Sequence, residues 1–434
     1  MNKELNIAFE VLQKVYFEGA YASIELNKAL TEDINKAIVT KIVYGVLEED
    51  IYLSYAVSKF VTKTPKPKVL LVLKIATYVS QNINSIPPFA LTNECVEITK
   101  KVADKYTAGF VNGTIKNIIK TKVNLPNPKV NFAKYLSVKY SYPTWYVDEL
   151  IKNFGTKFTE ELLAFKPTTS THIRVVRQTN TTLEQSVKMF IDLLQSNNID
   201  YQLTQIGSTM YVDYSELLKH EDLTKYYVVQ GLPSIVTALS VGVKPNDKVL
   251  DATSAPGGKA CLMAEVDESV RVTACDLHVH RVGLIRKYAQ SLGLANVRPL
   301  MCDATKYNAE WEQLFDCVLC DVPCSGMGVV TKKPDILLNR SMQDVNELAG
   351  LQYQILNNNA KYVKKGGVLV YSTCSIMPQE NEKVLTKFLQ SHDDFELTPI
   401  NTYGINVTNK DNMYTFYPHL TKTEGFFIGR LVRK

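Results

Sequence analysis

Hydrophobic residues recur at helical spacing through the first 125 residues of the chain. Ile7, Val11 and Val15 begin the pattern, and such spacing predicts amphipathic helices. Helices are predicted within residues 7–15, 23–30, 34–46, 51–61, 69–80, 91–106 and 110–119. A succession of helices with no strand pattern between them predicts an all-α bundle for residues 1–125.

The pattern changes after a proline-containing break at residues 125–128. A helix is predicted from Thr144 to a C-cap near Gly155. Beyond it, residues 171–176, 201–205 and 210–212 resemble short strands, and residues 183–195 a helix. Residues 126–240 are therefore predicted to form a linker and a small α/β subdomain, which could serve RNA contact or structure alone.

Strands alternate with helices over residues 241–434. Apolar strand-like runs occupy residues 248–251, 270–276, 297–303, 315–321 and 368–372, with helices predicted at 258–265 and 279–292. This alternation predicts a doubly wound, Rossmann-like parallel sheet.

Two cysteines follow predicted strands of this sheet. Cys324 lies in the sequence DVPCSG at residues 321–326, and Cys374 ends the run GGVLVYSTCS at residues 366–375. Ligands of open α/β sheets bind at the carboxyl ends of the strands. We therefore predict that these two thiols form a chemical pair.

A nucleoside cofactor is predicted beside the thiols. Gly257 and Gly258 allow a ligand to approach the backbone of the first strand-to-helix loop. Asp276, Asp303 and Asp321 end successive strands, where carboxylates can accept from ribose hydroxyls or an adenine amine. The pyrophosphate-binding fingerprint and the phosphate-binding loop are absent. S-adenosylmethionine, which has no pyrophosphate, fits this pattern.

Composition indicates a globular protein of ordinary polarity. Of the 434 residues, 45% are hydrophobic and 21% charged, and the net charge of +5 permits a polyanionic partner without requiring one. The eight cysteines favour a reducing cytoplasm. Cys317 and Cys320 are spaced as in metal motifs, but both fit a buried strand, and no metal is predicted. No apolar run is long enough for a membrane span. A cytoplasmic monomer is the default expectation.

Basic residues suggest where a nucleic acid would bind. Lys100, Lys101 and Lys105 cluster in one predicted helix, and Arg174 and Lys333 are isolated candidates for phosphate contacts. Lysine clusters are also typical of a solvated helix face, so their charge alone does not decide whether they contact a nucleic acid.

Three motifs of the C-terminal part resemble RNA cytosine-5 methyltransferases. They are APGGK at residues 255–259, DVPCSGMG at 321–328 and STCSIMPQENE at 372–382. The resemblance implies that Cys374 attacks the base, that Cys324 assists release, and that Asp321 contacts N3 or acts as a base. Chemistry alone does not decide which thiol attacks the base and which assists release, so the two roles are interchangeable. The implied cofactor contacts are Ser254, Ala255, Pro256, Gly257, Gly258, Lys259, Asp276, Arg281, Asp303 and Asp321.

The N-terminal part resembles NusB-like RNA-binding domains. The stretches VYGVL at residues 43–47, LTNECVE at 91–97 and GFVNGTI at 109–115 carry the likeness. Together the two parts resemble the RsmB (Sun) type of methyltransferase, which implies 16S ribosomal RNA, or a small-subunit assembly intermediate, as the partner.

Several positions depart from that family's pattern. Gly231 stands where the family usually has an acidic residue, and Val176 stands where it has an Asn. Residues 337–339 stand where the family usually has a basic residue followed by Trp. The alternatives considered are a transfer RNA methyltransferase, a DNA or small-molecule methyltransferase, and a non-catalytic ribosome-assembly or antitermination factor. The complete set of strand-end Asp and Cys residues argues against the last of these.

Overall fold

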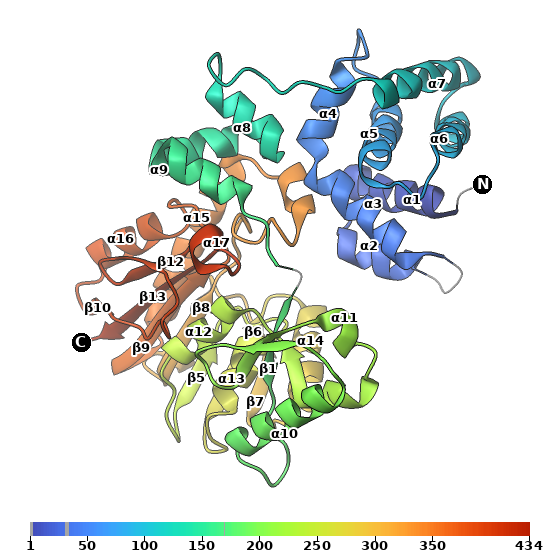
Figure 1. Ribbon diagram of the computed structural model, residues 1–434. Helices are drawn as coiled ribbons and strands as arrows, with labels where there is room; N and C mark the ends of the chain where they lie inside the picture. Colours follow the sequence, from blue (N-terminus) through green and yellow to red (C-terminus); the bar gives the residue numbers. More distant parts are fainter. Residues whose placement is uncertain (1–2, 31–33, 169) are drawn as a thin grey trace. The chain divides into compact units, whose positions relative to one another are not determined.

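The computed structural model describes residues 3–30, 34–168 and 170–434, which form two compact units (Figure 1). The first unit contains Met1–Phe165 and Val330–Met342. The second contains Lys166–Val329 and Gln343–Lys434. The segment 126–240, predicted as one piece, is thus divided between the units at Phe165.

The first unit is a helical bundle, which confirms the predicted all-α fold. Its helices are α1 (Lys3–Glu18), α2 (Ala22–Ala29), α3 (Lys36–Glu48), α4 (Asp50–Ser58), α5 (Pro67–Asn82), α6 (Pro88–Val102), α7 (Lys105–Lys120), α8 (Phe132–Tyr140) and α9 (Thr144–Ala164). Gly155 has a non-helical conformation inside α9, with φ of 80°, and the chain resumes a helix beyond it. The predicted helix end at Gly155 is thus a break with positive φ, and a second helical segment of α9 follows it directly.

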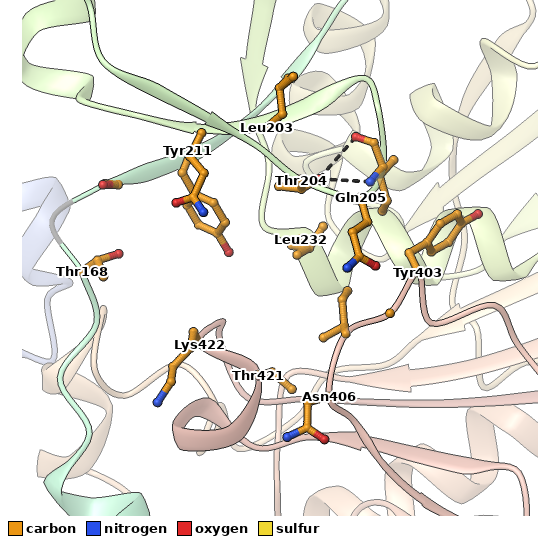
Figure 2. A pocket seen from close by; sticks show the side chains of 15 residues that line it. Thr168, Leu203, Thr204, Gln205, Tyr211, Leu232, Tyr403, Asn406, Thr421 and Lys422 are labelled. Carbon is orange, nitrogen blue, oxygen red and sulfur yellow. Dashed lines mark hydrogen bonds between the residues drawn. The ribbon is translucent and has the colours of Figure 1, made fainter.

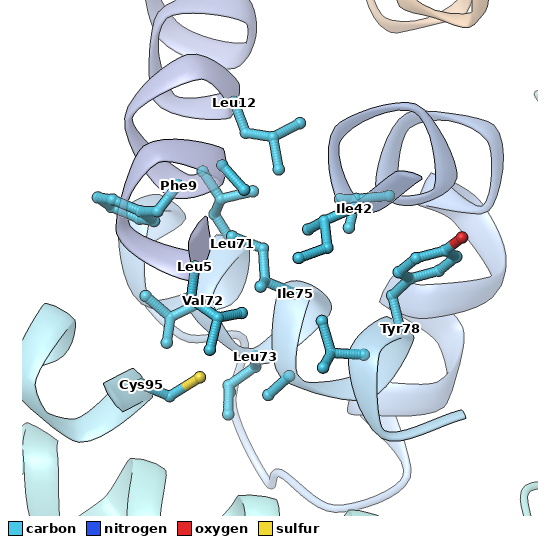
Figure 3. Packing of buried hydrophobic residues seen from close by; sticks show 14 of the residues in the cluster. Leu5, Phe9, Leu12, Ile42, Leu71, Val72, Leu73, Ile75, Tyr78 and Cys95 are labelled. Atoms are coloured by element: carbon cyan, nitrogen blue, oxygen red, sulfur yellow. The ribbon is translucent and has the colours of Figure 1, made fainter. Parts of the chain in front are cut away.

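The bundle core is built from the predicted apolar faces. Leu5, Leu12 and Ile42 are fully buried against residues of α5 (Figure 3). Gly45 of α3 lies against the ring of Tyr78, because a Cβ added at Gly45 would come within 1.9 Å of that ring. Glycine is required there for the close approach of α3 and α5.

The predicted helix 91–106 is interrupted in the structure. Helix α6 ends at Val102, and the side chain of Asp104 accepts a hydrogen bond of 2.8 Å from the Thr107 amide as the N-cap of α7. An Asp cap satisfies an amide that the new helix would leave unpaired. Lys105 therefore begins α7 and does not share a helix with Lys100 and Lys101.

A segment that follows the Cys324 loop in sequence belongs to the helical unit. The short 3-10 helix η3 (Pro334–Leu338) packs on α3, and Leu338 lies against the bundle core. Leu338, one of the positions at which the chain departs from the family pattern, thus has a packing role here.

The second unit contains a small sheet of four strands in the order β2-β3-β1-β4. Its elements are β1 (Thr171–Val175), α10 (Leu183–Ser196), β2 (Tyr201–Leu203), β3 (Thr209–Val212), α11 (Tyr214–Leu217), η1 (Glu221–Tyr226) and β4 (Tyr227–Val229). All its strand pairs are antiparallel. Phe190 of α10 is buried in its core.

The same unit contains the predicted large sheet, in the order β11-β12-β13-β9-β8-β5-β6-β7, with β10 paired to β13. Its strands are β5 (Lys248–Asp251), β6 (Arg271–Asp276), β7 (Val297–Met301), β8 (Phe315–Asp321), β9 (Val363–Thr373), β10 (Phe395–Thr398), β11 (Thr408–Lys410), β12 (Met413–Phe416) and β13 (Phe426–Arg433). Strands β5 to β9 run parallel and β13 antiparallel to β9. The Rossmann-like prediction is confirmed.

Helices cover both faces of this sheet. The helices are α12 (Leu232–Ser240), α13 (Gly258–Ala264), α14 (Val279–Ser291), α15 (Met342–Ala360), α16 (Glu382–Ser391) and α17 (Pro418–Thr421), with 3-10 helix η2 (Ala309–Trp311). Residues of β8 enter opposite cores: Cys317 packs with α12 and α13, and Cys320 packs with α15 and α16. This alternation explains why β8 is apolar on both faces. No helix in the described part of the chain is long and apolar enough to cross a membrane.

Candidate active site

The two predicted thiols meet at the carboxyl ends of adjacent parallel strands. In the register of β8 and β9, Asp321 pairs with Ser372. Cys324 and Cys374 follow these strands, and their Sγ atoms lie 3.0 Å apart. Residues 50 positions apart in sequence are thus brought into direct contact by the strand pairing.

The two thiols differ in acidity. A hydrogen bond from Cys324 lowers the pKa of the Cys374 thiol, and the positive charge of Lys259 acts in the same direction. The same hydrogen bond, together with burial, raises the pKa of Cys324 well above its usual value. A lowered thiol pKa favours the nucleophilic thiolate. Either thiol can donate in this contact, and the charge of Lys259 is the feature that favours a thiolate at Cys374.

Asp321 is held between two partners at the end of β8. One carboxylate oxygen accepts from the Lys259 ammonium at 2.6 Å, and the other accepts from the Ser372 hydroxyl at 2.7 Å. Burial by itself lowers the pKa of Lys259. The charge of Asp321 and its hydrogen bond to Lys259 have the larger combined effect, so the lysine pKa is raised. A fixed ion pair therefore lies beside the thiols.

The cofactor loop contains buried polar groups that no described residue satisfies. Neither carboxylate oxygen of Asp251 has a hydrogen-bond partner, and the same holds for the Ser254 hydroxyl. Burial, with the charge of Asp321, raises the pKa of Asp251 to about 7. Unsatisfied buried polar groups are costly, and S-adenosylmethionine, with its sulfonium and ammonium groups, fits this carboxylate-rich loop.

Two further predicted cofactor contacts, Asp276 and Arg281, lie close together. Arg281 lies 3.3 Å from the Asp276 carboxylate and donates to the Ala255 carbonyl at 3.3 Å. It thereby ties the second strand end to the glycine loop. Hydrogen bonds from the Thr305 hydroxyl and amide lower the pKa of Asp303.

Glu380 joins the two cysteine loops, and sequence reasoning assigned it no role. Its carboxylate accepts hydrogen bonds from the Ser325 amide at 2.7 Å and from the hydroxyls of Ser325 and Ser375. Gln352 donates to the same carboxylate at 3.0 Å. Glu380 is fully buried, and it fixes the residues that directly follow each thiol. The polar run of residues 378–382 gave no sign of this burial.

Two glycines fix the ends of these loops. The Gly328 amide donates to the Cys374 carbonyl at 3.0 Å, and the Gly425 amide donates to the Gly328 carbonyl at 2.7 Å. A Cβ at Gly328 would come within 2.2 Å of the Gly425 carbonyl oxygen. Glycine is required at this crossing because no side chain fits.

Glu380→Ala is expected to lower kcat more than tenfold. It leaves buried donors around both cysteine loops unpaired, which also costs roughly 1–3 kcal/mol of folding stability for each donor. Glu380→Gln is the matched variant, because it retains an oxygen for the Ser325 amide and should recover part of the rate. Methyl transfer and thermal unfolding are measured for both. A wild-type kcat in Glu380→Ala would show that Glu380 does not position the thiols.

The lysines predicted to bind RNA lie on the surface of the helical unit. Lys100, Lys101, Lys105 and Lys333 are exposed. Lys100 pairs with Glu97 at 2.6 Å, and such an exposed pair is weak enough to be exchanged for a phosphate. The structure brings none of them together with the thiols inside one compact unit.

Arg174 does not fit its predicted phosphate contact. Its side chain is only 2% exposed, and its guanidinium binds both carboxylate oxygens of Glu265 and the Gln230 side-chain oxygen. Bidentate pairing uses the planar fork of arginine. Arg174 therefore joins the small sheet to the region of α13, a structural role that the strand-like sequence around it did not reveal.

Both parts of the chain are similar to known proteins. Residues 238–432 match the family described as 16S rRNA methyltransferase RsmB/F, and residues 2–120 match the NusB family. The probable ribosomal RNA small subunit methyltransferase B of Bacillus subtilis is 31% identical over 99% of this chain and 98% of its own length.

Solved structures show the same fold. The crystal structure of PH0851 superposes with a TM-score of 0.83 at 24% identity, covering 100% of this chain and 99% of the other. NSun6 from Pyrococcus horikoshii, solved with SFG, has a TM-score of 0.58 at 21% identity, covering 68% of this chain and 99% of its own.

The fold and the strand-end site define an S-adenosylmethionine-dependent methyltransferase. Within that class, the chain belongs to the ribosomal RNA small subunit methyltransferase B family, with a NusB domain at its N-terminus.

Proposed function

We propose that this protein methylates carbon 5 of one cytosine in 16S ribosomal RNA through a covalent bond to Cys374. The observation that carries the proposal is the contact between Cys324 and Cys374, in which the hydrogen bond lowers the pKa of Cys374. Relatives named for the small-subunit RNA support the substrate. We place the reaction in the cytoplasm and take a monomer as the working form.

The chemistry requires a nucleophile because carbon 5 of cytosine is itself unreactive. The Cys374 thiolate adds to carbon 6, and the electron pair displaced from the ring double bond makes carbon 5 nucleophilic. S-adenosylmethionine, when bound, supplies the methyl group. Cys324 then removes the proton from carbon 5, and the electrons of that C–H bond expel Cys374. The two thiols thus divide addition and release between them.

Asp321 and Lys259 are assigned to the pyrimidine edge. The proposal has Asp321 facing N3, where a shared proton stabilises the adduct. Lys259, at 2.6 Å from that carboxylate, supplies a positive charge beside it. The target base must leave its stack to reach the thiol, which is easiest in a single-stranded or looped region.

Removal of the charge of Lys100, Lys101 and Lys105 together is expected to weaken RNA binding at every salt concentration. Each phosphate that a lysine neutralises adds about 0.7–0.9 to the slope of log affinity against log salt, so the triple variant should lower the slope by roughly two. Fluorescence anisotropy with a 16S transcript measures this. Lys152 and Lys157, exposed on α9, are the matched control. An unchanged slope would place the RNA elsewhere.

Bisulfite sequencing of ribosomal RNA from cells with and without the gene tests the substrate. The proposal predicts one 5-methylcytosine in 16S RNA that disappears with the gene. If ribosomal RNA is unchanged but a transfer RNA loses a 5-methylcytosine, the transfer RNA alternative is correct. If no RNA changes, the protein acts as a non-catalytic RNA-binding factor.

A further inference from the structure

A cavity of about 650 Å³ with a mixed polar and apolar lining lies in the second unit, and its lining is separate from the thiols and the cofactor loop (Figure 2). One wall is the region of β2 and β3, and the other is formed by the loop at residues 403–406 and the end of α17. Its volume falls in the range of roughly 300–1,000 Å³ typical of ligand sites. None of the predicted site residues lines it.

The lining combines three kinds of group that recognise an unstacked nucleotide. Gln205 and Asn406 carry amides, each of which offers a donor and an acceptor for a base edge. The ring of Tyr211 points into the cavity, and such rings stack on bases. Lys422 also lines the cavity and carries a positive charge that a phosphate can pair with, and its ammonium donates to the His419 carbonyl at 2.7 Å.

The amide groups are available to a ligand. Gln205 and Asn406 are exposed, and neither side-chain amide makes a hydrogen bond to another described residue. The Gln205 amide lies beside Gly404, because a Cβ added at Gly404 would come within 1.9 Å of its amide oxygen. Gly404 has φ of 70°, and this close approach locates the amide at the cavity wall.

The cavity lies a short distance from the reacting thiols. Gly425 follows Lys422 by three positions in the sequence, a span of at most about 11 Å in an extended chain. Gly425 donates to the Gly328 carbonyl, and the Gly328 amide donates to the Cys374 carbonyl. Consecutive nucleotides advance by roughly 3.4 Å when stacked and farther when splayed. A nucleotide a few positions from the target can therefore reach the cavity.

We propose that this cavity binds an unpaired nucleotide that neighbours the target cytosine in the RNA. This inference rests on the proposed function for the identity of the target, but not for the binding of RNA. Tyr211 stacks on the base, the amides of Gln205 and Asn406 contact its edge, and Lys422 faces its phosphate. A base held here draws its neighbour toward Cys374, so the cavity contributes to the choice of cytosine.

Photochemical crosslinking tests occupancy without requiring turnover. The full-length protein is mixed with a 16S transcript in which 4-thiouridine replaces part of the uridine, irradiated, and digested. Crosslinked peptides are expected to contain Tyr211 or residues 403–406. Crosslinks confined to other peptides would overturn the proposal, even if the RNA is methylated. Crosslinks here without methylation would support the cavity and contradict the proposed reaction instead.

Kinetics tests the role of the cavity in substrate selection. Tyr211→Ala is expected to raise KM for RNA about 5- to 100-fold, the range set by the energy of stacking one base on an aromatic ring. Gln205→Ala is expected to raise it about 2- to 10-fold, the range for one lost hydrogen bond, and KM for S-adenosylmethionine should be unchanged in both. Tyr211→Phe keeps the ring and should retain most of the affinity, which separates stacking from a folding defect. Gln290→Ala, exposed on α14, is the matched control. Wild-type KM values for RNA in both cavity variants would overturn the proposal.

Discussion

Cys374→Ala is expected to abolish methyl transfer, with a decrease of roughly 10³-fold or more, as is typical when an enzyme is deprived of its nucleophile. In the proposed reaction Cys374 is the nucleophile, whose pKa is lowered by the contact with Cys324 and by the charge of Lys259, and without it carbon 5 of the base is not activated. Single-turnover transfer of a labelled methyl group to a 16S transcript measures the decrease. Binding of RNA and of S-adenosylmethionine should be retained.

Cys95→Ala provides the control for removal of a thiol. Cys95 is fully buried in the helical bundle and makes no contribution to the proposed chemistry, so its variant should transfer methyl groups at the wild-type rate. If Cys374→Ala keeps substantial activity while Cys324→Ala is inactive, the roles of the two thiols are reversed.

Cys324→Ala is expected to trap the reaction after methyl transfer. The Cys324 thiol is 3.0 Å from Cys374, close enough to act on the adduct that Cys374 holds. Its raised pKa keeps it protonated before the adduct forms. Once the Cys374 sulfur is bonded to carbon 6, Cys324 releases its proton to water, and the resulting thiolate acts as the base. Without this base, RNA should stay attached through Cys374.

The trapped species is detected as an RNA–protein complex that survives denaturing electrophoresis. Peptide mass spectrometry should place a methylated cytidine on Cys374 in Cys324→Ala. The double variant, which lacks both thiols, should form no complex. Free turnover by Cys324→Ala, with no complex, would assign release to another group.

The thiol pair was accessible from sequence because two simple rules locate it. An apolar run followed by a Cys marks a strand end in both cases, and parallel strands place such ends at one edge of the sheet. The identity of the thiolate was not accessible by chemistry alone, because the difference in pKa arises from the hydrogen bond and from Lys259. Only the resemblance to the family assigned Cys374 that role.

Other features depend on tertiary contacts that no local pattern records. Glu380 is a charged residue in a polar run, yet its burial follows from the hydroxyls and amides that the two loops bring around it. Arg174 was a plausible phosphate ligand by its sequence, but the fold places Glu265, 91 residues away, beside it. The break between α6 and α7 depends on a single Asp104 cap within an otherwise helical pattern.

Tritium release from RNA made with [5-³H]cytidine tests the central claim most directly. The purified protein is incubated with this RNA and S-adenosylmethionine carrying a ¹⁴C-labelled methyl group, and both labels are counted. Methylation at carbon 5 through the Cys374 adduct predicts one tritium released to water for each methyl group transferred, and none in Cys374→Ala. Methyl transfer without tritium release would contradict the account, because the methyl group would then lie on another atom.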